Sequence, residues 1–308
     1  MATFLSILQT ALPVFLALGL GMLCRSRNFL SRDGVDALKK VVINITLPAV
    51  LLNAFASAKY TAAAIAVPVV VFLLCCLALA LGYGLVKLFR VKGRLSPFIA
   101  TGFEAGMIGY ALFALLFPGT SASEFAILDL GQTLFVFTLF KILLSGKTDL
   151  KAIARDMVTT PILWAVAAGV LLGATGLYDA MGSWGVRGIL DGATDFISAP
   201  TGMIILLTVG YDLVLKEIPW RKTAGLIALR LVVMAVVLGA MLLLNRTVLQ
   251  GAMFEGAAVL MCMLPPPYVI PVFADEPQER VQIASALSAL TLITMVLFTL
   301  YSVVLNLI

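Results

Sequence analysis

Long runs of apolar residues, separated by short polar stretches, extend along the whole chain. A helix that crosses the hydrocarbon of a bilayer needs about 20 predominantly apolar residues. Ten segments satisfy this need and predict ten membrane-spanning helices: 4–24, 37–57, 62–88, 95–117, 125–145, 158–177, 190–210, 223–244, 252–274 and 281–307. The polar stretches are too short to form a soluble domain, so residues 1–308 are expected to form a single integral membrane domain.

Two of these segments contain residues that interrupt a helix. Segment 252–274 has prolines at positions 265, 266, 267 and 271, and proline removes a backbone donor and clashes with the preceding turn. Segment 95–117 carries glycines at positions 102, 106 and 109. Interrupted helices at membrane depth are tolerated where they are buried in protein or line a cavity. A pair of them at matching places in two halves favours a transporter with its site near the midplane.

The two halves of the chain also match elsewhere. Pro13 corresponds to Pro161, and Pro48 corresponds to Pro200, at offsets close to the one between the two interruptions. These offsets predict a duplication of five spans, with repeats at 1–147 and 156–308. An odd number of spans places the two copies in opposite orientations. Chance coincidence of prolines is the alternative explanation.

Composition and charge agree with a membrane location. Of the residues, 62% are hydrophobic and 12% are charged, and the mean hydropathy is +1.10. Between the predicted spans, 17 Lys and Arg residues lie on one side of the membrane and three on the other. By the positive-inside rule, the side with 17 basic residues faces the cytoplasm. Both termini are therefore expected on the outer side of the cell's inner (plasma) membrane. The formal charge of +5 follows from these topology-setting loops and does not indicate a nucleic-acid partner.

Several function classes are disfavoured by what the chain lacks. It contains no histidine, and its four cysteines lack the spacing of metal ligands, so neither a metal nor another cofactor is predicted. The sequence has no phosphate-binding loop for ATP. Neither a histidine-based protease nor an aspartyl protease fits, and an enzyme is not expected. A channel is less favoured than a carrier.

Glu104 is the leading candidate for a coupling residue. It lies ten residues after Arg94, which is roughly 15 Å along a helix from the predicted inner edge. An ionisable group at that depth usually faces a cavity or a partner. Glu104 could therefore take up and release protons during transport. A static buried pair with Arg230 is the structural alternative.

The two interruptions supply candidate substrate contacts. Gly106, Met107 and Gly109 follow Glu104, and the exposed N–H groups of a second half-helix would suit a carboxylate. Carbonyls freed by Pro265, Pro266 and Pro267 would face them. Close packing of small residues, or a kink without a ligand, would explain the same sequence.

Three further polar residues complete the predicted site. Asp129 and Gln132 are three apart, so they share a helix face. Asp129 is near the outer end of its span, where solvent access and a coupling role are expected. Asn53 in the second span is a candidate substrate contact from the opposite side.

The order of these motifs resembles the auxin efflux carrier (AEC) family of bacterial permeases, relatives of the plant PIN-type auxin exporters. The resemblance covers the full length and is carried by short motifs at 44–52 (NITLPAVLL), 102–110 (GFEAGMIGY), 129–132 (DLGQ), 208–213 (TVGYDL) and the prolines at 265–267. It implies an all-α membrane protein with ten transmembrane helices in two inverted five-helix repeats. Spans 1, 2, 6 and 7 would form a scaffold through which two copies of the chain would dimerise, and spans 3–5 and 8–10 would form a transport domain that moves as an elevator.

The resemblance also implies a function. Relatives move small organic anions, such as dicarboxylates or auxin-like carboxylates, and broken spans 4 and 9 would cross at the substrate site. Many relatives carry Asn and Pro near the first crossover, where this chain has Glu104 and glycines. That departure favours proton coupling of a secondary carrier. A sodium-coupled carrier, or a carrier of a cationic or zwitterionic solute, stays open.

Overall fold

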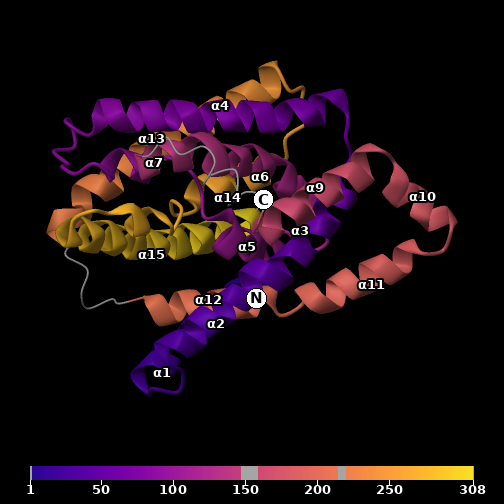
Figure 1. Cartoon of the computed structure of the whole chain (residues 1–308), viewed down its shortest axis with the longest axis horizontal. Helices are drawn as coiled ribbons and strands as arrows, with labels where there is room; N and C mark the ends of the chain where they lie inside the picture. Colours follow the sequence, from indigo (N-terminus) through magenta and orange to yellow (C-terminus); the bar gives the residue numbers. More distant parts are fainter. Residues whose placement is uncertain (1, 147–158, 214–219, 308) are drawn as a thin grey trace. The chain divides into compact units, whose positions relative to one another are not determined.

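The computed structural model describes residues 2–146, 159–213 and 220–307, and every element within these ranges is helical (Figure 1). The predicted connector between the two repeats, residues 148–155, lies outside the described residues. The expectation of an all-α fold is confirmed for the part of the chain that is described.

Six helices are long and apolar enough to cross a membrane, and a seventh candidate is a pair bent by 66°. The six are Ala64–Leu85, Ser96–Leu116, Ser123–Ser145, Arg187–Asp212, Thr223–Thr247 and Pro277–Leu307, and the bent pair is Pro161–Ala174 with Leu177–Ser183. These helices are compatible with a multi-pass membrane protein. Ten spans remain a prediction, because segments 37–57 and 252–274 are built from shorter helices, and segment 4–24 contributes only Ala11–Ser26, a shorter apolar helix.

Exposed apolar side chains on α4 (Ala62–Leu85) support the membrane assignment. Val69, Leu73 and Leu77 are 58%, 59% and 42% exposed and recur every four residues, on one face of the helix. A continuous exposed apolar stripe is unfavourable in water and suits contact with lipid.

The described residues divide into two compact units. Unit 1 contains residues 2–65, 106–127 and 159–213, and unit 2 contains residues 66–105, 128–146 and 220–307. The boundary near the first interruption falls between Ala105 and Gly106. Each unit therefore combines segments from both halves of the chain.

Unit 1 is built around two closely packed helix pairs. α1 (Ala2–Ser26) packs on α12 (Thr201–Asp212), and α3 (Leu47–Ala56) packs on α9 (Pro161–Ala174). A Cβ at Gly210 would lie 2.2 Å from the carbonyl oxygen of Leu18. Glycine at this position lets the backbones of α1 and α12 approach each other. The other elements that lie wholly in unit 1 are α2 (Arg32–Val41), η1 (Val42–Thr46), α5 (Tyr110–Leu116), α10 (Leu177–Ser183) and α11 (Arg187–Ser198).

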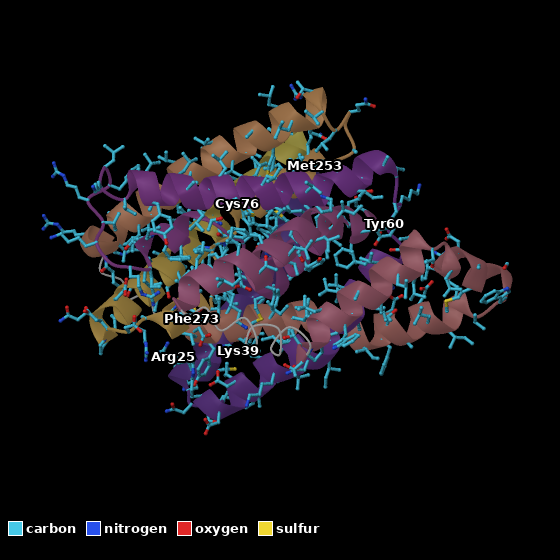
Figure 2. All side chains as sticks on the ribbon, turned by 45° about the horizontal axis from the view of Figure 1, so that its top comes forward. Arg25, Lys39, Tyr60, Cys76, Met253 and Phe273 are labelled. Atoms are coloured by element: carbon cyan, nitrogen blue, oxygen red, sulfur yellow. The ribbon has the colours of Figure 1, made fainter. Side chains whose placement is uncertain are left out.

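Basic side chains gather around the C-terminus of α12 in unit 1. Arg32 and Lys39 both form ion pairs with Asp212. Arg25 donates a hydrogen bond to the carbonyl of Tyr211, and Arg25 and Lys39 lie on neighbouring parts of this end of the unit (Figure 2). Cations are favourable at a helix C-terminus because its last carbonyls carry partial negative charge.

Unit 2 has an aromatic core between short helical pieces. Phe98, Phe135 and Phe140 are fully buried, and the ring centroid of Phe140 lies 5.4 Å from that of Phe98 and 5.7 Å from that of Phe135. The elements of this unit are most of α4, η2 (Ser96–Ala100), the second half of α6 (Ser123–Phe135), η4 (Val136–Phe140), α7 (Lys141–Ser145), α13 (Trp220–Thr247), α14 (Glu255–Met263), η6 (Ile270–Phe273) and α15 (Pro277–Leu307).

Both predicted interruptions are present. The first begins after η2, where residues 101–104 leave the helical conformation before η3 (Ala105–Gly109) resumes. The second follows α14, where residues 264–269 separate it from η6. Both non-helical stretches belong to unit 2.

Candidate functional site

The two interruptions cross each other in unit 2. The backbone N–H of Glu104 donates to the carbonyl of Pro265, with 2.8 Å between N and O. In return, the N–H of Tyr268 donates to Oε2 of Glu104 at 2.7 Å. Pro265, Pro266 and Pro267 have no backbone N–H, so Tyr268 carries the first N–H after them. The Glu104 carboxylate accepts a hydrogen bond from this N–H.

Gly102 and Pro267 fix how closely the two segments approach. Gly102 has φ +68°, and a Cβ at this position would lie 2.8 Å from Cγ of Pro267. Left-handed backbone and close approach both favour glycine. The crossing therefore requires glycine on one segment and places a proline ring against it.

Arg230 on α13 joins the two segments from the side. Its side chain is buried, with 2% exposed, and its guanidinium donates to the carbonyls of Ile99 at 3.3 Å and Leu264 at 2.9 Å. The guanidinium carbon lies 5.3 Å from the ring centroid of Phe103. These bonds satisfy one carbonyl on each of the two crossing segments. Arg230 thus binds backbone carbonyls, whereas the sequence analysis considered a buried ion pair with Glu104.

Gln132 and Asp129 hold the first break from α6. Gln132 Nε2 donates to the carbonyl of Phe103 at 2.9 Å, and its Oε1 accepts from the N–H of Phe103 at 3.3 Å. Oδ1 of Asp129 accepts from Gln132 and Thr133, both at 3.3 Å. Gln132 thus replaces the backbone partners that a continuous helix would give Phe103.

The predicted solvent access of Asp129 is wrong. Its side chain is only 4% exposed. The prediction used distance from the span end, which does not reveal which helix face turns inward. By contrast, Glu104 is half-buried, and of the two carboxylates it is the more accessible.

Threonines that the sequence prediction missed support the same crossing. Thr101 donates to the carbonyl of Cys75 at 2.7 Å, and Thr294 donates to the carbonyl of Met263 at 2.6 Å. The hydroxyls of Tyr268 and Thr291 share a hydrogen bond at 2.8 Å. Hydroxyl side chains within apolar spans near a break were the available signal, because freed backbone groups need such partners.

The remaining predicted residues are distributed between the units. Pro265, Pro266 and Pro267 are buried in the second break in unit 2, whereas Gly106, Met107 and Gly109 lie in η3 and belong to unit 1. A Cβ at Gly106 would lie 3.1 Å from Cδ2 of Leu47, which agrees with close packing there.

Asn53 belongs to a separate polar cluster in unit 1. Its amide donates to Thr194 at 3.2 Å and to Asp195 at 3.3 Å, and the hydroxyl of Tyr178 donates to its Oδ1 at 3.4 Å. Tyr178 also donates to Asp191 at 2.6 Å. Asp191 and Asp195 thus belong to the same cluster as Asn53, although they lie far from it in the sequence.

Comparison of the sequence with protein-family models gives no match, and comparison with curated proteins gives none. The class that the chain can be assigned to therefore rests on its own features. In its described residues the chain is all-helical, and two interrupted helices cross each other. Its apolar helices are compatible with several passes through a membrane.

Proposed function

We propose that this chain is a secondary carrier for a small organic acid, such as a dicarboxylate or an auxin-like carboxylate, and that it is coupled to protons through Glu104. The observation that carries the proposal is the crossing of the two interruptions, with a half-buried carboxylate on a freed backbone N–H. Such crossings are suited to binding because they offer backbone donors and acceptors at membrane depth.

The charge around the crossing favours an anionic substrate. Arg230 provides a buried positive charge, and its Nε has no hydrogen-bond partner among the described residues. Backbone N–H groups of the break are further donors. The Glu104 carboxylate occupies one of these donors, so it competes with a substrate carboxylate.

That competition supplies a coupling mechanism. When Glu104 is ionised, it accepts the N–H of Tyr268 and repels an incoming anion. When Glu104 is protonated, its charge is removed, and a substrate carboxylate can take its place at the N–H of Tyr268. A substrate anion and a proton would then bind together and cross together.

The finer architecture is part of the same proposal. We expect ten helices in two inverted repeats, both termini on the outer side of the plasma membrane, and an elevator-like motion. The division into units agrees with this scheme in part, since spans 1, 2, 6 and 7 fall in unit 1 and most of spans 3–5 and 8–10 in unit 2. A homodimer through the scaffold is expected, and crosslinking in membranes tests it.

A carrier of sodium-coupled, cationic or zwitterionic type is the second candidate. It is favoured by two carboxylates in one region: Asp129 bonds to Gln132, and Gln132 bonds to the backbone of Phe103, the residue directly before Glu104. Replacing the pH gradient by a sodium gradient, and testing competition by organic cations, separates it from the first candidate.

The test is flux of radiolabelled malate and indole-3-acetate into proteoliposomes with an imposed pH gradient. The wild type should accumulate one of these compounds. Glu104→Gln mimics the protonated carboxyl, so gradient-driven accumulation should be lost while exchange of labelled for unlabelled substrate continues. Glu276→Gln removes an exposed carboxylate of the same unit and should behave as the wild type.

Two results would contradict the proposal. Accumulation by Glu104→Gln at the wild-type level would remove Glu104 from coupling. If folded wild-type protein moved neither compound under any gradient, the organic-acid assignment would be wrong.

A further inference from the structure

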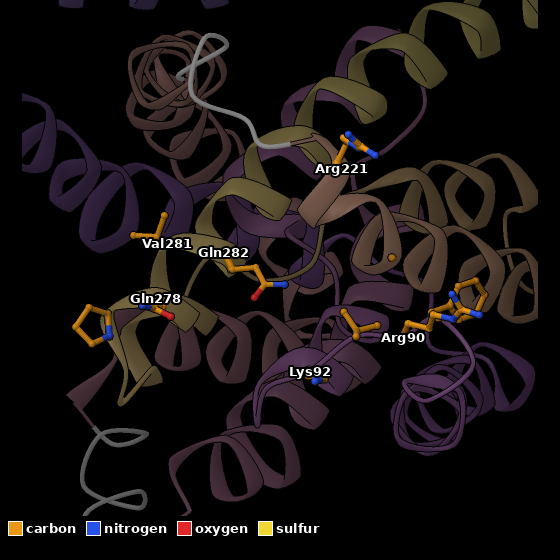
Figure 3. A pocket seen from close by; sticks show the side chains of 10 residues that line it. Arg90, Lys92, Arg221, Gln278, Val281 and Gln282 are labelled. Atoms are coloured by element: carbon orange, nitrogen blue, oxygen red, sulfur yellow. The ribbon is translucent and has the colours of Figure 1, made fainter.

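Unit 2 contains a pocket whose lining residues are different from those of the helix crossing. Its volume is about 930 Å³, and it lies where α4 ends and where α13 and α15 begin (Figure 3). Segment 89–92 lines one part of it, Arg221 and Gly225 line another, and the first turns of α15 line the rest. Because all three helices are candidate membrane spans, the pocket is expected at the boundary between lipid and water.

Local backbone features form this pocket. A Cβ at Gly225 would lie 2.7 Å from the carbonyl oxygen of Phe89, so α13 packs directly against the chain that follows α4. Arg90 adopts left-handed backbone (φ 53°), and the N–H of Val91 bonds back to the carbonyl of Val86 at 3.0 Å. Non-glycine residues rarely adopt this conformation. The tight turn brings Arg90 and Lys92 to the same pocket as Arg221.

The charge of the pocket is one-sided. Three cations, Arg90, Lys92 and Arg221, line it together with Gln278 and Gln282, and no acidic residue occurs among the described residues that line it. None of the three cations forms an ion pair with another described residue. Two acidic residues are next to this lining in the sequence: Glu276 is exposed before Pro277, and Glu279 accepts a hydrogen bond from the N–H of Leu95 at 2.8 Å.

The start of α15 adds to the positive potential. Pro277 and Gln278 are the first residues of this 31-residue helix, and both line the pocket. The N-terminus of a helix carries partial positive charge and favours anions. The pocket thus combines three charged donors, two amides and a helix N-terminus.

We propose that this pocket binds a phosphate-bearing anion. Two guanidinium groups and an ammonium group are the donors that recognise phosphate oxygens. The volume exceeds that of a single inorganic phosphate, so the pocket has room for a larger molecule that carries the phosphate group. The position at the ends of three apolar helices makes two sources possible: the headgroup of an anionic phospholipid, or a soluble phosphorylated compound.

The test measures the thermal stability of the purified full-length protein in neutral detergent. Ligands that bind only the folded state raise Tm with concentration. The probes are phosphatidylglycerol, phosphatidylcholine as a zwitterionic control, and inorganic pyrophosphate. The variant R90Q/K92Q/R221Q removes the cations of the pocket, and R27Q/K40Q/K59Q removes three exposed cations of unit 1 and is matched in charge.

Stabilisation of the wild type by phosphatidylglycerol alone would identify a lipid headgroup as the source, and stabilisation by pyrophosphate would identify a soluble one. In either case the pocket variant should need a roughly hundredfold higher concentration of the probe for the same rise in Tm. Three basic residues are replaced, and each contributes about a factor of five to the affinity for an anion. The matched variant should respond as the wild type does. The proposal is overturned if neither probe raises Tm, or if both variants lose the response equally. If the pocket variant does not fold, Arg221→Gln alone should still weaken binding about fivefold.

Discussion

At the scale of single residues, Arg230 and Glu104 perform opposite tasks at the helix crossing. Arg230 is buried and donates to two carbonyls, one from each interrupted segment. Glu104 is half-buried, and its carboxylate accepts the N–H of Tyr268. Arg230 therefore fixes the crossing, and the bond from the backbone N–H of Glu104 to Pro265 joins the segments independently of the Glu104 carboxylate.

The structural task of Arg230 predicts a graded loss of stability. Arg230→Lys keeps the charge but cannot reach both carbonyls with one ammonium in the same fork geometry. Arg230→Met removes both bonds and leaves two buried carbonyls unpaired, at about 1–3 kcal/mol each. We expect Tm to fall in the order wild type, Arg230→Lys, Arg230→Met, measured by size-exclusion chromatography after heating.

The Arg230→Met variant can also contradict the stabilising role of Arg230. Replacing a buried charge by a well-packed apolar side chain can be neutral or stabilising. An Arg230→Met protein as stable as the wild type would mean that the two hydrogen bonds only offset the cost of burying the guanidinium.

The residue-scale details were the least predictable from sequence. Glu104, Gln132 and the three prolines were selected correctly as members of one region, because polar or helix-breaking residues are conspicuous in apolar spans. Their bonding was not predicted, since Gln132 and Arg230 bind backbone groups that become available only when a distant segment leaves the helix. The burial of Asp129 was missed for a related reason: its helix face is determined by packing.

At the scale of elements, glycine contacts determine how α1 and α12 pack. Gly210 faces the carbonyl oxygen of Leu18 at a distance that no side chain permits. Gly21, on the other helix, faces the carbonyl oxygen of Leu207 in the same way. Small residues on both helices therefore allow backbone contact along this pair.

This packing predicts a clear difference between two glycine variants. Gly210→Ala must push α12 away from α1, and overpacking of this kind typically costs about 1–3 kcal/mol. Gly19→Ala, in the same helix pair, meets nothing within 4 Å and should leave Tm unchanged or slightly higher. Heating curves of the two purified variants test this, and equal Tm values would show that the helices can separate without cost.

The elements themselves followed well from the sequence pattern. Each of the ten apolar segments contains helix in its described part, and the interruptions lie at Gly102 and at Pro265–Pro267, whereas Gly106 and Gly109 lie within η3. Proline and glycine act through local backbone sterics, which sequence reveals directly. Segment 190–210 differs, because Ala199 and Pro200 separate α11 from α12.

At the scale of the whole molecule, the chain order and the compact units do not coincide. Unit 1 and unit 2 each take segments from both halves, and the first interruption lies next to a boundary between them. Exchange of partners between the two proposed repeats would produce this interleaving. The sequence pattern suggested a division of the chain into two repeats. It could not show that residues 106–127 belong to unit 1, because that assignment depends on tertiary packing.

The predicted orientation is testable on the intact protein. Cysteines introduced at Lys59 and Arg27, both exposed, should react differently with a membrane-impermeant maleimide applied to whole cells. In a background with the four native cysteines replaced by alanine, Lys59→Cys should be labelled and Arg27→Cys should be protected until the cells are opened. Labelling of Arg27→Cys alone would reverse the assigned orientation.

The crossing of the two interruptions also constrains how the protein is made. A ribosome delivers Glu104 to the membrane more than 150 residues before it reaches Pro265 and Tyr268. During that interval the N–H of Glu104 lacks its partner Pro265, and the carbonyl of Ile99 lacks its partner until Arg230 has been made. The first half must therefore wait, solvated by water or held by the insertion machinery. Biogenesis is then completed by the arrival of the last third of the chain, and the two halves made as separate polypeptides would become stable only after meeting in the bilayer.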